Sequence, residues 1–185
     1  MKILVTGAKG MVGTALCNNL KNIRDNKNRI RPSLHIEEIY EYDLGDEDKL
    51  EEYCQKADFV FNLAGINRPN NPEDFYNGNF GFASTLLNTL KKHNNKAPIM
   101  LSSSIQATLI GRYNGDYGRS KLEGEEYVFN YGKENGVKVA VYRFPNLMGH
   151  SRPRYNSAVS TFCWAVANDE EFTVNDRNTE LELLY

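Results

Sequence analysis

The stretch that decides the fold is residues 2–13, KILVTGAKGMVG, at the start of the chain. Its first part, KILVT, is a short apolar run that ends at a glycine, which is typical of a buried strand. Its second part places Gly7, Gly10 and Gly13 at the spacing GxxGxxG. Apolar residues at helical spacing follow directly. A strand, a glycine turn and a helix in this order predict the first unit of a dinucleotide-binding α/β fold.

Each glycine of the turn has its own physical reason. Gly7 permits the tight turn, Gly10 lets the backbone approach a pyrophosphate, and Gly13 lets the helix pack closely on the strand. The beginning of the helix then offers unpaired N–H groups and a partial positive charge to the phosphates. We therefore predict a phosphate-binding turn here.

Further along the chain, short strand-like runs alternate with longer helical stretches. We expect strands over 36–42, 58–63, 98–101 and 137–142, and helices over 10–24, 47–56, 73–93 and 117–135. This alternation predicts an α/β fold, a Rossmann-like doubly wound parallel sheet with helices on both faces. Alternating Leu181, Leu183 and Tyr185 predict a half-buried strand at the very end. A strand that ends at the last residue suggests a truncated chain.

Composition narrows the function classes. The chain has 185 residues, and its 22 Lys+Arg and 24 Asp+Glu give a formal net charge of −2. A hydrophobic share of 41% and a charged share of 25% fit one globular domain and argue against a disordered chain. The balanced charge disfavours a nucleic-acid partner, and no stretch approaches the ~18 apolar residues of a membrane span.

Cysteine and histidine positions give no sign of a metal or a disulfide framework. Cys17, Cys54 and Cys163 are far apart and form no CxxC pair, and the histidines lack metal-ligand spacing. No charged segment followed by a ~7–15-residue apolar run opens the chain, so we expect a cytoplasmic protein without a secretory signal.

A second cluster of residues points to proton transfer. Tyr117 and Lys121 lie four apart, on one face of an expected helix, and Ser104 closes an expected strand at its carboxyl end. Ligands of open parallel sheets bind outside those ends. A free tyrosine titrates near ~10, so we expect a cationic Lys121 to lower the pKa of Tyr117.

Together these motifs resemble the extended short-chain dehydrogenase/reductase family, in its nucleotide-sugar branch. The matching pieces are TGAKGMVG at 6–13, Asp43-Leu44, Leu63-Ala64-Gly65, Asn79, SSS at 102–104, YGRSK at 117–121 and Arg143-Phe144-Pro145-Asn146. Within this branch the chain is similar to capsular-polysaccharide reductases that carry a C-terminal zinc-containing cupin, which is absent from these residues. The resemblance implies that 1–185 forms one NAD(P)-binding reductase domain, truncated within or before the substrate lobe.

The resemblance implies roles for individual residues. It implies Ser104, Tyr117 and Lys121 as catalytic residues, and Ser104, Asn146 and Asn156 as substrate-binding residues. The implied cofactor-binding residues are Gly7, Lys9, Gly10, Met11, Val12, Gly13, Asp43, Leu44, Leu63, Ala64, Gly65, Asn79, Tyr117, Lys121 and Pro145.

The resemblance also implies a reaction. We expect NADPH-dependent reduction of the C4 keto group of a UDP-linked 6-deoxy-amino sugar in capsular polysaccharide precursor synthesis, with a homodimer as a family habit. Lys9 lies inside the glycine turn, where its stem can reach the 2′-phosphate of NADPH, whereas Asp43 would favour NADH. Ile105 and Gln106 argue against a 4,6-dehydratase, which carries an acid after the serine. A C4 epimerase with bound NAD and a non-catalytic dinucleotide-binding module remain open.

Two departures from the family pattern affect the substrate side. The usual Val-Tyr-Gly after the serine strand is Ala107-Thr108-Leu109 here. The last strand, where the family often has an arginine for the diphosphate, carries Glu180-Leu181-Glu182.

Overall fold

A computed structural model describes residues 1–28, 30, 33–66, 71, 76–108, 115–149, 151, 154, 157–174 and 176–185. Contacts divide the chain into two compact units, Met1–Arg143 and Phe144–Tyr185, and each is described by itself. The expected single domain over 1–185 stays a prediction.

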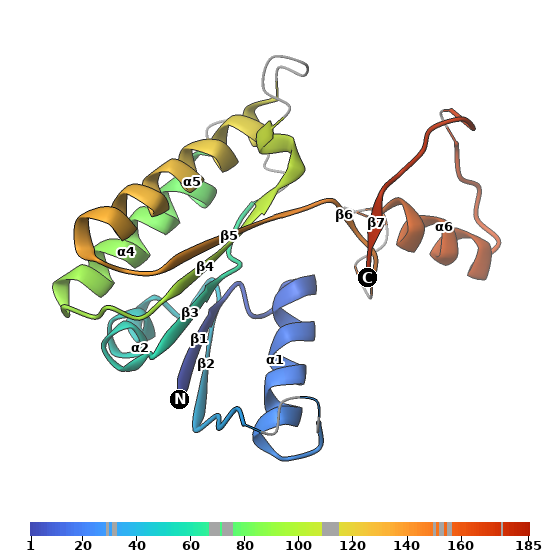
Figure 1. Cartoon of the computed structure of the whole chain (residues 1–185). Coiled ribbons are helices and arrows are strands. Elements are labelled where there is room, and N and C mark those ends of the chain that lie inside the picture. Colours follow the sequence, from blue (N-terminus) through green and yellow to red (C-terminus); the bar gives the residue numbers. More distant parts are fainter. Residues whose placement is uncertain are drawn as a thin grey trace. The chain divides into compact units, whose positions relative to one another are not determined.

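The first unit alternates strands and helices along the chain (Figure 1). Its elements are β1 (Lys2–Thr6), α1 (Met11–Arg24), β2 (Glu38–Tyr42), η1 (Glu47–Lys49), α2 (Leu50–Lys56), β3 (Phe59–Asn62), η2 (Tyr76–Gly81), α4 (Phe82–Lys92), β4 (Ile99–Ser104), η3 (Ile105–Thr108), α5 (Asp116–Asn135) and β5 (Val139–Phe144). The second unit contains β6 (Asn146–Leu147), α6 (Ala158–Ala167) and β7 (Leu183–Leu184).

The five-stranded sheet has the order β2-β1-β3-β4-β5. Strands β1 to β4 pair in parallel, with Ile3 opposite Ile39 on one side and Phe59 on the other. The chain order reverses at β1, so the switch point of this sheet lies between β1 and β3. Ligands of such sheets bind at the switch point, outside the carboxyl ends of the strands.

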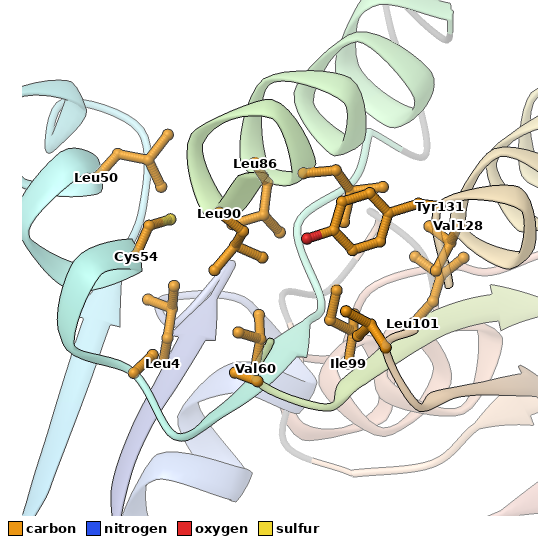
Figure 2. Close-up of a cluster of buried hydrophobic side chains, with 14 of the residues drawn as sticks. Leu4, Leu50, Cys54, Val60, Leu86, Leu90, Ile99, Leu101, Val128 and Tyr131 are labelled. Atoms are coloured by element: carbon orange, nitrogen blue, oxygen red, sulfur yellow. The ribbon is translucent and has the colours of Figure 1, made fainter. Parts of the chain in front are cut away.

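Helices cover both faces of the sheet, as the predicted Rossmann-like fold requires. Successive side chains of β1 point to opposite faces of the sheet. Leu4 points into a core shared with α2, α4 and α5, whereas Ile3 and Val5 pack toward α1. Figure 2 shows the larger core, where leucines of α4 lie between α2 and the apolar face of α5. Helix α5 then ends at Gly136 in the left-handed conformation, with φ 66°.

The helix predicted over 73–93 differs from the expectation. Residues Tyr76–Gly81 form a π-helical segment before the α-helix begins at Phe82. A Cβ on Gly78 would lie 2.3 Å from the Cδ1 atom of Ile66, so the glycine lets this segment approach the residues that follow β3. Such π-helical segments are frequent at functional sites.

The second unit also departs from the expectation. Helix α6 was not predicted; it begins after Ser157, whose hydroxyl accepts a hydrogen bond from the Ser160 N–H (3.2 Å). The expected half-buried terminal strand is wrong in its burial: Leu183 is 44% exposed and Tyr185 is 95% exposed. The reason is that, among the described residues, β7 pairs with the two-residue strand β6 alone. Among the described helices of both units, none is long and apolar enough to cross a membrane.

Candidate active site

The predicted site residues of the first unit gather at one edge of the sheet. Because β1 to β4 are parallel, their carboxyl ends meet at the same edge. The glycine turn follows β1, Asp43 follows β2, and Leu63 follows β3. Ser104 is the last residue of β4. This edge therefore contains the two predicted groups, the phosphate turn and the proton-transfer residues.

Close packing in the glycine turn explains its glycines. Gly7 has φ 68°, and a Cβ there would lie 2.8 Å from the Ala64 backbone nitrogen. A Cβ on Gly13 would lie 2.0 Å from the Gly7 carbonyl oxygen. The turn is closed by the Gly10 N–H, which donates to that same oxygen (3.0 Å). The turn leaves room for the backbone alone, and a side chain at Gly7 or Gly13 would clash with it.

The N-terminus of α1 fits an anionic group. Gly10 is the N-cap residue and supplies no side chain to the first N–H groups, and the first turn carries no acidic residue. Met11, Val12 and Gly13 form that first turn. A helix end whose first N–H groups are not capped by a side chain favours a phosphate through hydrogen bonds and the helix dipole. The residues present therefore fit the pyrophosphate of a dinucleotide.

Asp43, which follows the neighbouring strand β2, stabilises the glycine turn through hydrogen bonds. Its carboxylate accepts hydrogen bonds from the backbone N–H of Lys9 (2.7 Å) and of Leu44 (2.9 Å). The Lys9 side chain is 74% exposed, and its Nζ lies 3.9 Å from an Asp46 carboxylate oxygen. Its charge is thus presented to solvent beside the end of β2.

A buried polar pair fixes the segment after β3. The Thr6 hydroxyl donates to the Asn62 side-chain oxygen (2.8 Å) and accepts from the Ala64 N–H (3.3 Å). This places Leu63 and Ala64 next to Gly7, with Gly65 following. Sequence analysis missed the roles of Thr6 and Asn62. Their only signal was a polar residue at the end of two otherwise apolar strands.

The predicted catalytic residues come together at the beginning of α5. The Ser104 hydroxyl is a hydrogen-bond partner of the Tyr117 phenol, and it accepts a hydrogen bond from the Gln106 N–H (3.2 Å). Lys121 Nζ lies 5.7 Å from the centroid of the Tyr117 ring and donates to the Ser102 carbonyl (3.3 Å). The spacing of four residues on one helix thus turns both side chains toward the end of β4.

Burial is the main cause of the pKa shifts of Tyr117 and Lys121. Burial raises the pKa of Tyr117, and the hydrogen bond to Ser104 only opposes it. Burial also lowers the pKa of Lys121 to about 8, while the Glu125 carboxylate opposes that change. The expectation that the pKa of Tyr117 is lowered is therefore wrong, because burial raises it overall. The lysine charge lies over the ring and binds a carbonyl, and desolvation of the phenol dominates.

Gly118 allows this close approach. A Cβ there would lie 2.7 Å from the backbone oxygen of Gln106 in η3. The first turn of α5 can therefore rest on the backbone that follows Ser104. A larger residue would separate Tyr117 from Ser104.

Behind these residues lies a buried carboxylate that sequence analysis missed. Glu125 is 2% exposed, and its side chain bonds to the Ser103 hydroxyl and to the Arg143 guanidinium of β5. In the sequence nothing separates it from Glu123 and Glu126 on the same helix.

Four predicted residues remain, two in the second unit and two whose side chains lie outside the described residues. Pro145 and Asn146 belong to the second unit, where Asn146 Nδ2 donates to the Glu182 carbonyl (3.3 Å). The backbone of Asn79 lies in η2, but its side chain is outside the described residues, as is the whole of Asn156. In the described ranges, no group of three or more His, Cys, Asp or Glu side chains is placed to hold a metal ion.

Comparison with known proteins gives one consistent result. Residues 3–185 match the model of the NAD dependent epimerase/dehydratase family. The chain is 36% identical over 187 residues to a UDP-2-acetamido-2,6-beta-L-arabino-hexul-4-ose reductase of Pseudomonas aeruginosa, covering 100% of this chain and 46% of that protein.

Two solved structures are similar to this chain in fold. The capsular polysaccharide assembling protein CapF from Staphylococcus aureus superposes with a TM-score of 0.80 at 39% identity, over 100% of this chain and 45% of CapF. A UDP-glucuronic acid 4-epimerase from Bacillus cereus, solved with UDP-glucuronic acid and NAD, has a TM-score of 0.76 at 22% identity, over 100% of this chain and 69% of that one. The latter likeness shows the fold alone.

The chain spans about half the length of its reductase relative and of CapF. The family match, the reductase relative and the CapF superposition confirm the predicted resemblance. On these grounds the chain belongs to the NAD dependent epimerase/dehydratase family, the extended short-chain dehydrogenases/reductases.

Proposed function

We propose that the protein reduces the C4 keto group of a UDP-linked 6-deoxy-amino sugar with NADPH, in the cytoplasmic synthesis of capsular polysaccharide precursors. The observation that carries this proposal is the convergence of Ser104, Tyr117 and Lys121 at the same edge of the sheet as the glycine turn. The 36% identity to a UDP-sugar 4-keto reductase and the similarity to CapF support the substrate class.

The residues suit a reduction that needs a proton. A bound nicotinamide cofactor would supply the hydride for the keto carbon, and negative charge would then develop on the sugar oxygen. Tyr117 then donates its phenol proton to that oxygen, and Ser104 holds the oxygen by a hydrogen bond. Since burial raises the pKa of Tyr117, the phenol keeps its proton at neutral pH, as a general acid must.

Cofactor binding is assigned to the glycine turn and its neighbours. Gly7, Gly10 and the first turn of α1 would hold the pyrophosphate. Lys121 would hold the nicotinamide ribose in addition to its contact with Ser102. The exposed Lys9 ammonium is available to the 2′-phosphate of NADPH, which supports NADPH over NADH.

Two measurements on the same preparation test this proposal. Turnover of a UDP-4-keto-6-deoxy-amino sugar is followed by NADPH absorbance, beside a titration of NADPH and NADH binding. The expected result is stoichiometric NADPH oxidation with a reduced sugar product. Tightly retained NAD⁺ and interconversion of C4 epimers without net cofactor consumption would identify an epimerase instead. Dinucleotide binding without turnover of either substrate would identify a binding module.

A further inference from the structure

Glu125 is the one buried acidic side chain in the part of the chain that the structure describes. Taking a carboxylate out of water is costly unless it is paired and hydrogen-bonded. Here it is both: its Oε1 accepts from Arg143 Nε (2.9 Å), its Oε2 accepts from Arg143 Nη2 (2.5 Å), and the Ser103 hydroxyl donates to it.

Its position relates this pair to the proposed site. Tyr117, Lys121 and Glu125 are spaced four residues apart, so they follow one another along one face of α5. Each contacts one of three successive residues of β4. Ser104 binds Tyr117, the Ser102 carbonyl accepts from Lys121, and the Ser103 hydroxyl donates to Glu125.

The pair with Arg143 extends this contact to β5. Arg143 lies on the last strand of the sheet, and its side chain is 42% exposed while that of Glu125 is 2% exposed. The ion pair therefore joins α5 to β5, and the Ser103 hydrogen bond joins α5 to β4. A pair of apolar residues of similar volume could fill the same space at no loss of stability. A purely structural role does not require the charge.

The negative charge of Glu125 affects Lys121, which lies one helical turn away on α5. Burial lowers the pKa of Lys121, and the Glu125 carboxylate is the opposing influence. Within the described residues, the other elements packed against this face carry no charge near it. Strand β4 and the short helices η2 and η3 contain no charged residue, and α4 has its lysines only in its last turn. Arg143 is bound to Glu125 itself.

We infer that Glu125 is a positioning residue, which fastens the α5 face carrying Tyr117 and Lys121 to β4 and β5 and supplies the negative charge beside Lys121. The inference deepens the proposed function and rests on its assignment of Tyr117 and Lys121. The charge holds the lysine as an ammonium, and the hydrogen bonds hold the phenol at Ser104.

The first test does not depend on turnover. The side-chain resonance of Lys121 is titrated by NMR in the wild type, in Glu125→Gln and in Glu126→Gln, with Lys121→Met as the assignment control. Glu126 is exposed on the same helix, so its substitution is the matched control. We expect Glu125→Gln to lower the pKa of Lys121 by about one pH unit, and Glu126→Gln to leave it unchanged. Equal titration in all three proteins would overturn the inference.

The second test measures turnover. For Glu125→Gln we expect kcat to fall about tenfold with little change in the KM of the sugar, and the alkaline limb of the pH profile to move to lower pH. Glu125→Asp keeps the charge but shortens the side chain, so kcat should fall while the alkaline limb stays in place. This variant also decides the matter if Glu125→Gln does not fold. Wild-type kcat and an unchanged limb in the Glu125 variants would refute the inference.

The two tests separate the inference from the proposed function. If the wild type does not reduce the sugar, the proposed function fails, and the Lys121 titration still reports on Glu125. If the wild type turns over and the Glu125 variants match it in both readouts, only the inference fails.

Discussion

Replacing Gly13 with alanine tests the packing that shapes the phosphate turn. The new Cβ would lie 2.0 Å from the Gly7 carbonyl oxygen and 2.8 Å from the Ala8 Cα, and both atoms are backbone. Since the contact must open by roughly 1 Å or more, α1 has to move away from β1. Overpacking of this kind costs about 1–3 kcal/mol of unfolding free energy. For a chain of this size we expect Tm to fall by roughly 2–12 °C.

The same shift moves the N–H groups that would face the pyrophosphate. We therefore expect the affinity for NADPH to fall by at least about tenfold, which is about 1.4 kcal/mol. Thermal unfolding and a fluorescence titration with NADPH measure the two effects. Gly124→Ala is the control, because a Cβ there meets nothing within 4 Å. It should leave NADPH affinity unchanged and stabilise α5 by about 0.5–1 kcal/mol. A Gly13→Ala protein with wild-type Tm and wild-type affinity would refute the reasoning.

Three further expectations follow from the site. Gly118→Ala places a Cβ 2.7 Å from the Gln106 oxygen, so kcat should fall about tenfold while NADPH affinity changes little; equal loss in both would contradict this. Lys9→Ala should weaken NADPH binding by about tenfold to a hundredfold and leave NADH binding nearly unchanged, as parallel titrations would show. Because burial lowers the pKa of Lys121 in the folded state to about 8, from its usual 10.5, the folded state binds fewer protons than the unfolded state between these pH values. The wild type should therefore gain unfolding free energy relative to Lys121→Met from pH 8 to 10, measured by urea denaturation.

Local patterns predicted most of the first unit. Strand β1 has the predicted bounds, and α1 begins one residue after the predicted start, because Gly10 is its N-cap. These elements depend on short-range periodicity and on glycine, which the sequence displays directly. The π-helical segment before α4 was missed because it depends on contact between Gly78 and Ile66, which are distant in the sequence.

In the candidate site, too, local spacing could be predicted from the sequence, and contacts between distant segments could not. Tyr117 and Lys121 could be found because four-residue spacing places them on one helix face. Glu125 has the same spacing from Lys121, yet only the fold shows that it is buried against Ser103 and Arg143. The direction of the Tyr117 pKa was predicted wrongly for a similar reason. Desolvation depends on burial, and burial of one phenol cannot be derived from local sequence.

Tyr117→Phe tests whether Tyr117 is the proton donor of a nucleotide-sugar reduction. The measurement is single-turnover oxidation of NADPH with a UDP-4-keto-6-deoxy-amino sugar, beside an NADPH titration of the same protein. Loss of a general acid costs roughly 10²–10⁴ in rate. We therefore predict that reduction by Tyr117→Phe is abolished while NADPH affinity stays close to that of the wild type. A variant that keeps more than about a tenth of the wild-type rate would contradict the assignment.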